Sequence, residues 1–240
     1  TGNLGTSLTT RQPILQEIIV RLPHTLNLAC SSMIVALVIG IPTGIIAAIK
    51  KDTFIDNLLT TTSLAGISIP NFWLGSMLIL LFSVTLRWLP TGGMNEPFWT
   101  AVGFKQAILP SISLGLAVAA GFTRIGRSAM LDVLQSDYIR TAKSKGIKGY
   151  KVILIHALRN AMIPIITQFG TSFGGLLGGA IITEQVFVIN GVGTYLINAI
   201  NQRNYPVVQS TVLVIAAMFI IVNLIVDLVY VLIDPRISYE

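Results

Sequence analysis

Long apolar segments alternate with short polar segments along this chain. Five apolar segments are long enough to cross the hydrocarbon core of a bilayer, which takes roughly 20 apolar residues. They cover approximately residues 25–49, 60–86, 107–127, 162–183 and 208–232. Pro70 is expected to kink the second segment, and glycines four residues apart in the fourth favour close packing between helices. The pattern predicts an all-α, polytopic bundle of transmembrane helices.

The composition supports this interpretation and the distribution of charge orients the chain. Charged residues make up only 11% of the sequence and hydrophobic residues 53%, whereas a soluble domain carries roughly 25% charged residues. A net charge of +6 could suggest a nucleic-acid partner in a soluble protein, but here it follows the positive-inside rule. With Lys50 and Lys51 inside, eleven of the sixteen Lys and Arg residues lie on the inner side. We expect no nucleic-acid partner and a cytoplasmic C-terminus.

An odd number of spans with an inner C-terminus places Thr1 outside. Residues 1–23 contain no apolar segment that could bring them across, so we expect a further span upstream and six spans in all. Residues 1–23 then form an extracytoplasmic connector and interfacial helix, with Ile14, Ile18 and Leu22 on one face. Residues 24–234 form the transmembrane domain and residues 235–240 a cytoplasmic tail.

The inner loop 128–161 is polar, basic and periodic. Apolar positions recur at helical spacing on both sides of Gly146, at Leu131, Leu134, Tyr138 and Ala142 and then at Ile147, Tyr150, Leu154 and Leu158. This pattern predicts two short amphipathic helices broken at a glycine. On the cytoplasmic face, such a pair is typical of a docking surface for another protein.

The chain lacks the usual motifs of catalysis and metal binding. It contains no Gly-x-x-x-x-Gly-Lys-[Ser/Thr] phosphate loop, and Cys30 is its single cysteine. His24 and His156 fall on opposite sides of the membrane, so they cannot share a metal site. Asp227 is a carboxylate inside the last span, which leaves open a role in proton coupling or a structural role. We expect no catalytic residue, no cofactor and no metal in this chain.

The loop also carries an ordered motif. It reads Tyr138-Ile-Arg140-Thr141-Ala142, then Lys145-Gly146, and later His156-Ala-Leu-Arg159-Asn-Ala. This resembles the EAA loop in permease subunits of binding-protein-dependent ABC importers, in the form found in the first permease of the oligopeptide/dipeptide/nickel branch. Arg140 replaces the acid of the general EAA pattern, and Arg159 its later proline. Further matches extend over nearly the whole chain, among them Arg21-Leu22-Pro23, Ser68-Ile69-Pro70, Glu184-x-Val186-Phe187, Tyr205-Pro206-Val207 and Asp234-Pro235-Arg236.

The resemblance implies a non-catalytic subunit of the bacterial or archaeal cell membrane. Its partners would be a second homologous permease, two ABC ATPase subunits that bind ATP and Mg²⁺, an extracytoplasmic substrate-binding protein and membrane lipid. The inner loop 128–161 would be the coupling loop, which docks the ATPase. Its docking residues would be Tyr138, Arg140, Thr141, Ala142, Lys145, Gly146, Tyr150, Leu154, His156 and Arg159. From their positions, residues expected on the translocation path are Asn71, Trp73 and Glu184.

Three alternatives stay open at this point. Within the family, the cargo could be nickel or a metal chelate in place of a dipeptide or oligopeptide. A stand-alone secondary transporter would work without ATPases and would depend on Asp227. A non-transporting membrane scaffold would show no flux at all.

Overall fold

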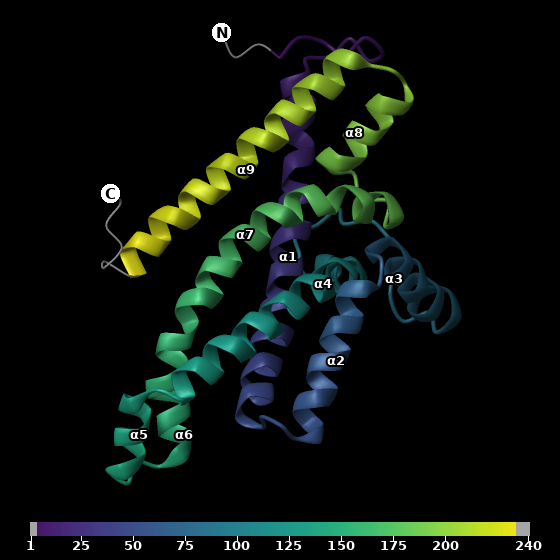
Figure 1. Cartoon of the computed structure of the whole chain (residues 1–240). Coiled ribbons are helices and arrows are strands. Elements are labelled where there is room, and N and C mark those ends of the chain that lie inside the picture. The colour runs from purple at the N-terminus through teal and green to yellow at the C-terminus, as the bar shows by residue number, and fades with distance from the viewer. Residues whose placement is uncertain (1–3, 234–240) are drawn as a thin grey trace. The chain divides into compact units, whose positions relative to one another are not determined.

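The computed structural model describes residues 4–233, apart from the side chains at 179, 226, 227 and 229–233. The predictions for the Asp227 side chain, for Asp234-Pro235-Arg236 and for the tail 235–240 therefore lie outside the described residues. Within residues 4–233 the regular elements are helices (Figure 1), and one isolated bridge joins Thr6 to Pro13. The all-α prediction is confirmed for this part of the chain.

The helices follow one another in a simple order. They are α1 (Ile14–Ile49), α2 (Phe54–Ser68), α3 (Asn71–Leu78), a π-helical turn (Ile79–Thr85), α4 (Ala101–Leu134), α5 (Asp137–Ser144), α6 (Gly149–Lys151), a second π-helical turn (Val152–Ala157), α7 (Leu158–Val186), α8 (Val192–Asn201) and α9 (Tyr205–Ile233). In residues 4–233, four helical segments are long and apolar enough to span a membrane: Ile14–Ile49, Ala101–Leu134, Gly149–Gly178 and Tyr205–Ile225.

A fifth span exists if the broken pair Phe54–Ser68 and Asn71–Thr85 counts as one segment. The kink predicted at Pro70 is thus a complete break, because α2 ends at Ser68 and α3 begins at Asn71. Pro70 has φ −62° and ψ 131°. Its fixed φ and missing N–H suit a position next to the start of a helix, where the N–H would have no helical acceptor.

The chain divides into two compact units. Unit 1 comprises Thr1–Ile34, Ile69–Gly115 and Phe173–Leu224, and unit 2 comprises Val35–Ser68, Leu116–Ser172 and Ile225–Glu240. Several long helices contribute to both units.

In unit 1 the N-terminal segment packs onto the last two helices. Ile14 and Ile18 are buried, in one apolar cluster with Val192, Ala199 and Val207. Nearby, the Asn204 Nδ2 donates a hydrogen bond of 2.9 Å to Ser7 Oγ, and Ser210 Oγ donates one of 2.9 Å to the Leu4 carbonyl. The helical face that the sequence predicts at the membrane interface forms the first part of α1. In unit 1 this face is covered by protein.

One glycine of the fourth predicted span makes a close helix contact in unit 1. A Cβ on Gly174 would lie 2.7 Å from Phe219 Cε2 of α9, whereas around Gly175 and Gly178 no atom lies within 4 Å of such a Cβ. The glycine spacing predicted a crowded helix, and Gly174 confirms it. Gly175 and Gly178 instead line an open apolar groove against α9.

In unit 2, α1 and α4 approach almost backbone to backbone. A Cβ on Gly40 would lie 2.5 Å from the Ala119 carbonyl oxygen, and a Cβ on Gly44 would lie 2.7 Å from that of Thr123. The hydroxyls of Thr43 and Thr123 are 2.6 Å apart and hydrogen-bonded. The two glycines allow this approach because any side chain would separate the helices.

Candidate functional site

Of the two short helices that the sequence predicts around Gly146, the first is a separate helix, α5, whereas the second, α6, continues without a break through the second π-helical turn into α7. α5 ends at Ser144 and α6 begins at Gly149, and Gly146 between them has φ +72°. No atom lies within 4 Å of a Cβ built on Gly146, so the backbone conformation, and not crowding, demands glycine here. The first helix is shorter than predicted, because Leu131 and Leu134 belong to the end of α4. In Figure 1 the two helices, hereafter the hairpin (residues 137–157), lie at that end of α4.

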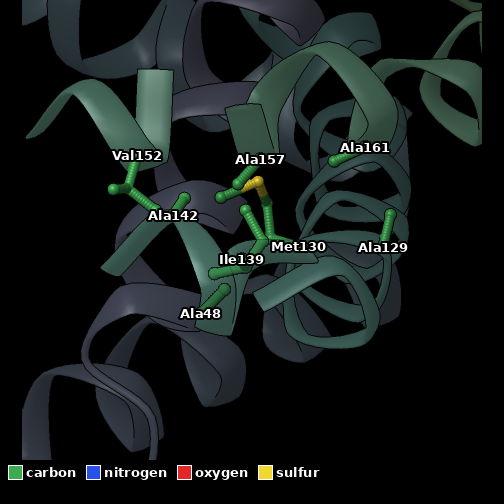
Figure 2. Packing of buried hydrophobic residues seen from close by; sticks show 8 residues of the cluster. All are labelled: Ala48, Ala129, Met130, Ile139, Ala142, Val152, Ala157 and Ala161. Atoms are coloured by element: carbon green, nitrogen blue, oxygen red, sulfur yellow. The ribbon is translucent and has the colours of Figure 1, made fainter. Parts of the chain in front are cut away.

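An apolar core fixes the hairpin to the rest of unit 2. Figure 2 shows its buried residues, which come from α1, α4, α5, the second π-helical turn and α7: Ala48, Ala129, Met130, Ile139, Ala142, Val152, Ala157 and Ala161. The Met130 side chain lies between Ile139 and Ala157 in this view, and all three are fully buried. Because such cores are close-packed, the hairpin and the three long helices resist moving independently at this point.

The exposed surface of the hairpin is both apolar and basic. Four large side chains are exposed there, with exposed fractions of 44% for Tyr138, 58% for Tyr150 and Leu154, and 56% for Ile155. The cations on the same elements are exposed too: Arg140, Lys143, Lys145, Lys148 and Lys151. Exposed apolar groups rimmed by charge are typical of a protein–protein contact.

The structure locates each residue predicted for the coupling loop. Ala142 is buried in the core and His156 is half-buried, while the others are exposed: Tyr138, Arg140, Thr141, Lys145, Gly146, Tyr150, Leu154 and Arg159. The Asn160 side-chain amide donates a hydrogen bond of 2.7 Å to the Tyr138 hydroxyl. This bond ties the ring of Tyr138 to the start of α7.

Two of the residues predicted on the path lie at the start of α3 in unit 1. Asn71 is half-buried, and its carbonyl accepts a hydrogen bond of 2.8 Å from Ser113 Oγ. Trp73 is 48% exposed. Their placement on a translocation path stays a prediction.

Glu184, which follows directly after the predicted span 162–183, still belongs to a helix in the structure. It lies in the last turn of α7 and is fully buried. Thr25 Oγ1 donates a hydrogen bond of 2.6 Å to its Oε1, and the N–H of Thr194, in the first turn of α8, donates one of 2.8 Å to its Oε2. Burial raises the pKa of Glu184, against the lowering effect of these donors. The buried side chain thus accepts a hydrogen bond at the N-terminus of α8, and its placement on a translocation path stays a prediction.

The sequence reasoning missed an ion pair in unit 2. Arg127 Nε and Nη2 donate to the two carboxylate oxygens of Asp56, each at 2.7 Å. The Asp56 side chain is 2% exposed and that of Arg127 28%. The Asp52 N–H adds a third bond at 3.0 Å. The partners are 71 residues apart, and no local pattern links them.

Within residues 4–233 no group of three or more His, Cys, Asp and Glu side chains gathers as metal ligands would. Among the described residues, the exposed apolar and basic side chains of the hairpin form the surface best suited to bind a partner protein.

Comparison with known proteins gives concordant results. Residues 40–239 match the family described as "Binding-protein-dependent transport system inner membrane component". The chain is 43% identical to the di/tripeptide transport system permease protein DppB of Pseudomonas aeruginosa (strain UCBPP-PA14), over 100% of this chain and 77% of that protein. It is 44% identical to the glutathione transport system permease protein GsiC of Escherichia coli (strain K12), over 100% and 76%.

A third relative is the dipeptide transport system permease protein DppB of Alkalihalophilus pseudofirmus, which is 44% identical over 100% of this chain and 78% of the relative. Among solved structures, an inward-facing conformation of the MetNI methionine ABC transporter contains a similar chain, with a TM-score of 0.78 and 14% identity. The similarity covers 92% of this chain and 98% of that one.

Proposed function

Because the chain belongs to the family of inner-membrane components of binding-protein-dependent transport systems, we propose that it is the permease subunit of an ATP-driven importer of short peptides. The observation that carries the proposal is the hairpin. Its inner face is locked into the core of unit 2, and its outer face exposes aromatic and basic side chains. Such a surface can receive a mechanical input from a partner and pass it to the long helices.

In this proposal the partner is an ABC ATPase on the cytoplasmic side. The apolar residues Tyr138, Tyr150 and Leu154 would enter a groove on the ATPase, as amphipathic helices do. The surrounding Lys and Arg side chains would pair with acids at its rim. ATP and Mg²⁺ would be held by two ATPase subunits, so that this subunit contributes no catalysis. A second permease and an extracytoplasmic binding protein complete the assembly, and the C-terminus lies inside.

The peptide cargo is supported by the relatives. The three named above are permeases of di/tripeptide, glutathione and dipeptide transport systems, and glutathione is itself a tripeptide. These relatives favour a peptide over nickel or a metal chelate. The substrate-binding protein would select the cargo, and the permease would let it pass.

Co-purification of the full-length permease with candidate ATPase subunits tests the docking role. Gly146→Val places a β-branched residue at φ +72°, a region that costs an L-residue about 1–2 kcal/mol. We expect the ATPase to be lost or strongly reduced with Gly146→Val. Gly146→Asn, which tolerates the left-handed region, should retain the ATPase.

The exposed face is tested separately. Tyr150→Ala together with Leu154→Ala should release the ATPase without lowering the melting temperature, since both side chains are exposed. The matched control is Trp99→Ala, in unit 1, where the indole is 74% exposed and release is not expected. If no ATPase associates even with the unaltered protein, the importer proposal fails. Asp227→Asn should then be tested for loss of ATP-independent flux.

A further inference from the structure

A groove of mixed apolar and polar lining runs between α2 and α4 within unit 2. Its volume is about 410 Å³, which is within the range of small-molecule sites. Its α4 wall is one continuous helical stripe of eight residues: Ala120, Thr123, Arg124, Arg127, Ser128, Leu131, Asp132 and Gln135. Four residues of α2 form the facing wall: Thr60, Ser63, Leu64 and Ile67. The groove therefore combines apolar side chains with hydroxyl, amide and charged groups.

Half of the polar groups in this groove are already engaged inside the protein. Arg127 is paired with Asp56, and Thr60 donates to the same carboxylate at 3.3 Å. Ser63 donates to the Leu59 carbonyl at 2.7 Å, and Thr123 Oγ1 is bonded to Thr43. These contacts hold the walls of the groove in place.

The remaining polar side chains have no such bond. Within residues 4–233 the side chains of four groove residues make no hydrogen bond or ion pair and are exposed: Arg124, Ser128, Asp132 and Gln135. Since Arg127 is neutralised by Asp56, Arg124 is the cation in the groove whose charge is not balanced. It lies three residues before the inner end of the predicted span 107–127, in the helix Ala101–Leu134.

An unpaired guanidinium within a span is costly where it faces lipid, and such groups usually face the interior of a bundle or a watery pathway. Arg also binds carboxylates with two parallel hydrogen bonds, which makes it the usual partner for that group. A free carboxylate and a free amino group are the two charged groups that short peptides share whatever their side chains.

We infer that the α2–α4 groove is a section of the translocation path, in which Arg124 binds the terminal carboxylate of the passing peptide. This inference rests on the proposed function and names the part of the chain that contacts the cargo. Asp132, two helical turns further along α4, faces the amino end. At 1.5 Å per residue, Arg124 and Asp132 are roughly 12 Å apart along the helix. A peptide of two or three residues spans roughly 7–10 Å, which suits a short zwitterion held between the two side chains.

Transport by the complete assembly, reconstituted in vesicles of neutral phosphatidylcholine, tests the inference. Uptake of radiolabelled alanyl-alanine and ATP hydrolysis are measured together for Arg124→Gln, Arg124→Lys and the control Arg87→Gln, whose side chain is exposed in unit 1. We expect Arg124→Gln to lower uptake by about tenfold or more, because a charge-assisted bond is lost. ATP hydrolysis should stay within about twofold of wild type, since the hairpin is untouched. Arg124→Lys should recover part of the uptake, and Arg87→Gln should match the wild type.

The outcomes separate this inference from the proposed function. If the wild-type assembly shows no ATP-dependent uptake, the importer proposal itself fails. If the wild type transports and Arg124→Gln transports equally well, only the inference about the groove is overturned. A loss of uptake that appears only in vesicles containing anionic phosphatidylglycerol would also overturn it, because Arg124 would then bind a lipid phosphate.

Thiol labelling gives a second test, which does not require the Arg124 variants to fold. In a Cys30→Ser background, Ser128→Cys places a thiol in the groove, and Thr62→Cys places one on α2 outside it. We expect a membrane-impermeant thiol reagent to label the Ser128→Cys variant, and peptide under turnover to slow this labelling several-fold. The Thr62→Cys variant should not respond to peptide. A labelling rate of Ser128→Cys that peptide leaves unchanged contradicts the inference.

Discussion

The Asp56–Arg127 pair should show a strong energetic coupling, because within residues 4–233 neither side chain forms an ion pair with any other residue. Asp56 accepts two bonds of 2.7 Å from the guanidinium and its side chain is 2% exposed, against 28% for Arg127. Breaking a buried pair by removing one partner typically costs about 3–5 kcal/mol, since the other charge is left unpaired. For a chain of 240 residues, a loss of 3 kcal/mol corresponds to a melting temperature lower by about 6 °C or more.

The two single variants should differ in how strongly they destabilise the protein. Arg127→Met leaves the more deeply buried charge, with only the Asp52 N–H at 3.0 Å and the Thr60 hydroxyl at 3.3 Å as donors. Asp56→Ala leaves the more exposed charge, which water can partly solvate. We therefore expect Arg127→Met to be the more destabilising substitution.

The assay is a double-mutant cycle by thermal unfolding of the purified protein in detergent. Asp56→Ala combined with Arg127→Met removes both charges, so the double variant should be more stable than the sum of the single changes predicts, by about 1–3 kcal/mol. Asp137→Ala is the control, because Asp137 and Arg140 form an exposed pair at 3.7 Å and such pairs contribute little. Additivity within about 0.5 kcal/mol would refute the reasoning.

Three further predictions concern other contacts. Met130→Ala should destabilise the protein by about 2–5 kcal/mol through the cavity it leaves under a fully buried side chain, whereas Leu8→Ala, at a side chain 67% exposed, should change the melting temperature little. Gly92→Ala should cost about 1–3 kcal/mol, because its Cβ would lie 2.2 Å from the Phe187 carbonyl oxygen; Gly149→Ala, which meets nothing within 4 Å, should not destabilise, and equal melting temperatures would contradict this. Burial raises the folded-state pKa of Glu184. The side chain's contribution to folding stability is therefore present below the unfolded pKa of about 4.3 and lost as the pH rises through the folded pKa. The melting temperature of Glu184→Gln relative to wild type should then increase with pH, and a difference independent of pH would argue against a raised pKa.

The sequence predicted the features that depend on local pattern. Apolar length predicted the spans, since a helix must cover the bilayer within one segment. The periodicity around Gly146 predicted a helix on each side of the glycine, which has φ +72°, but not that the second would continue into α7. The break at Pro70 was predicted as a kink, because the local effect of proline is known but the extent of the break depends on the surrounding packing.

Features that depend on contacts between distant segments were missed or misplaced. Asp56 looks like an ordinary charge beside a span, and only the fold shows that Arg127 reaches it. Glu184 follows an apolar segment, so the local pattern does not predict its burial. In the structure its carboxylate is buried because Thr25 of α1 and Thr194 of α8 donate hydrogen bonds to it. Ile14 and Ile18 have the same spacing whether lipid or protein covers them, so periodicity identified the face but not the group that covers it.

The core beneath the hairpin explains how a partner could move helices that it does not touch. Ile139 and Ala142 of α5 are buried in one cluster with Ala48 of α1, Met130 of α4 and Ala161 of α7. Close-packed side chains cannot be compressed or pulled apart without losing many contacts at once. A displacement of α5 therefore either moves these three helix ends together or opens a cavity, at a cost of about 24 cal/mol per Å³. Since the first outcome avoids that cost, packing alone can transmit motion from the hairpin into unit 2.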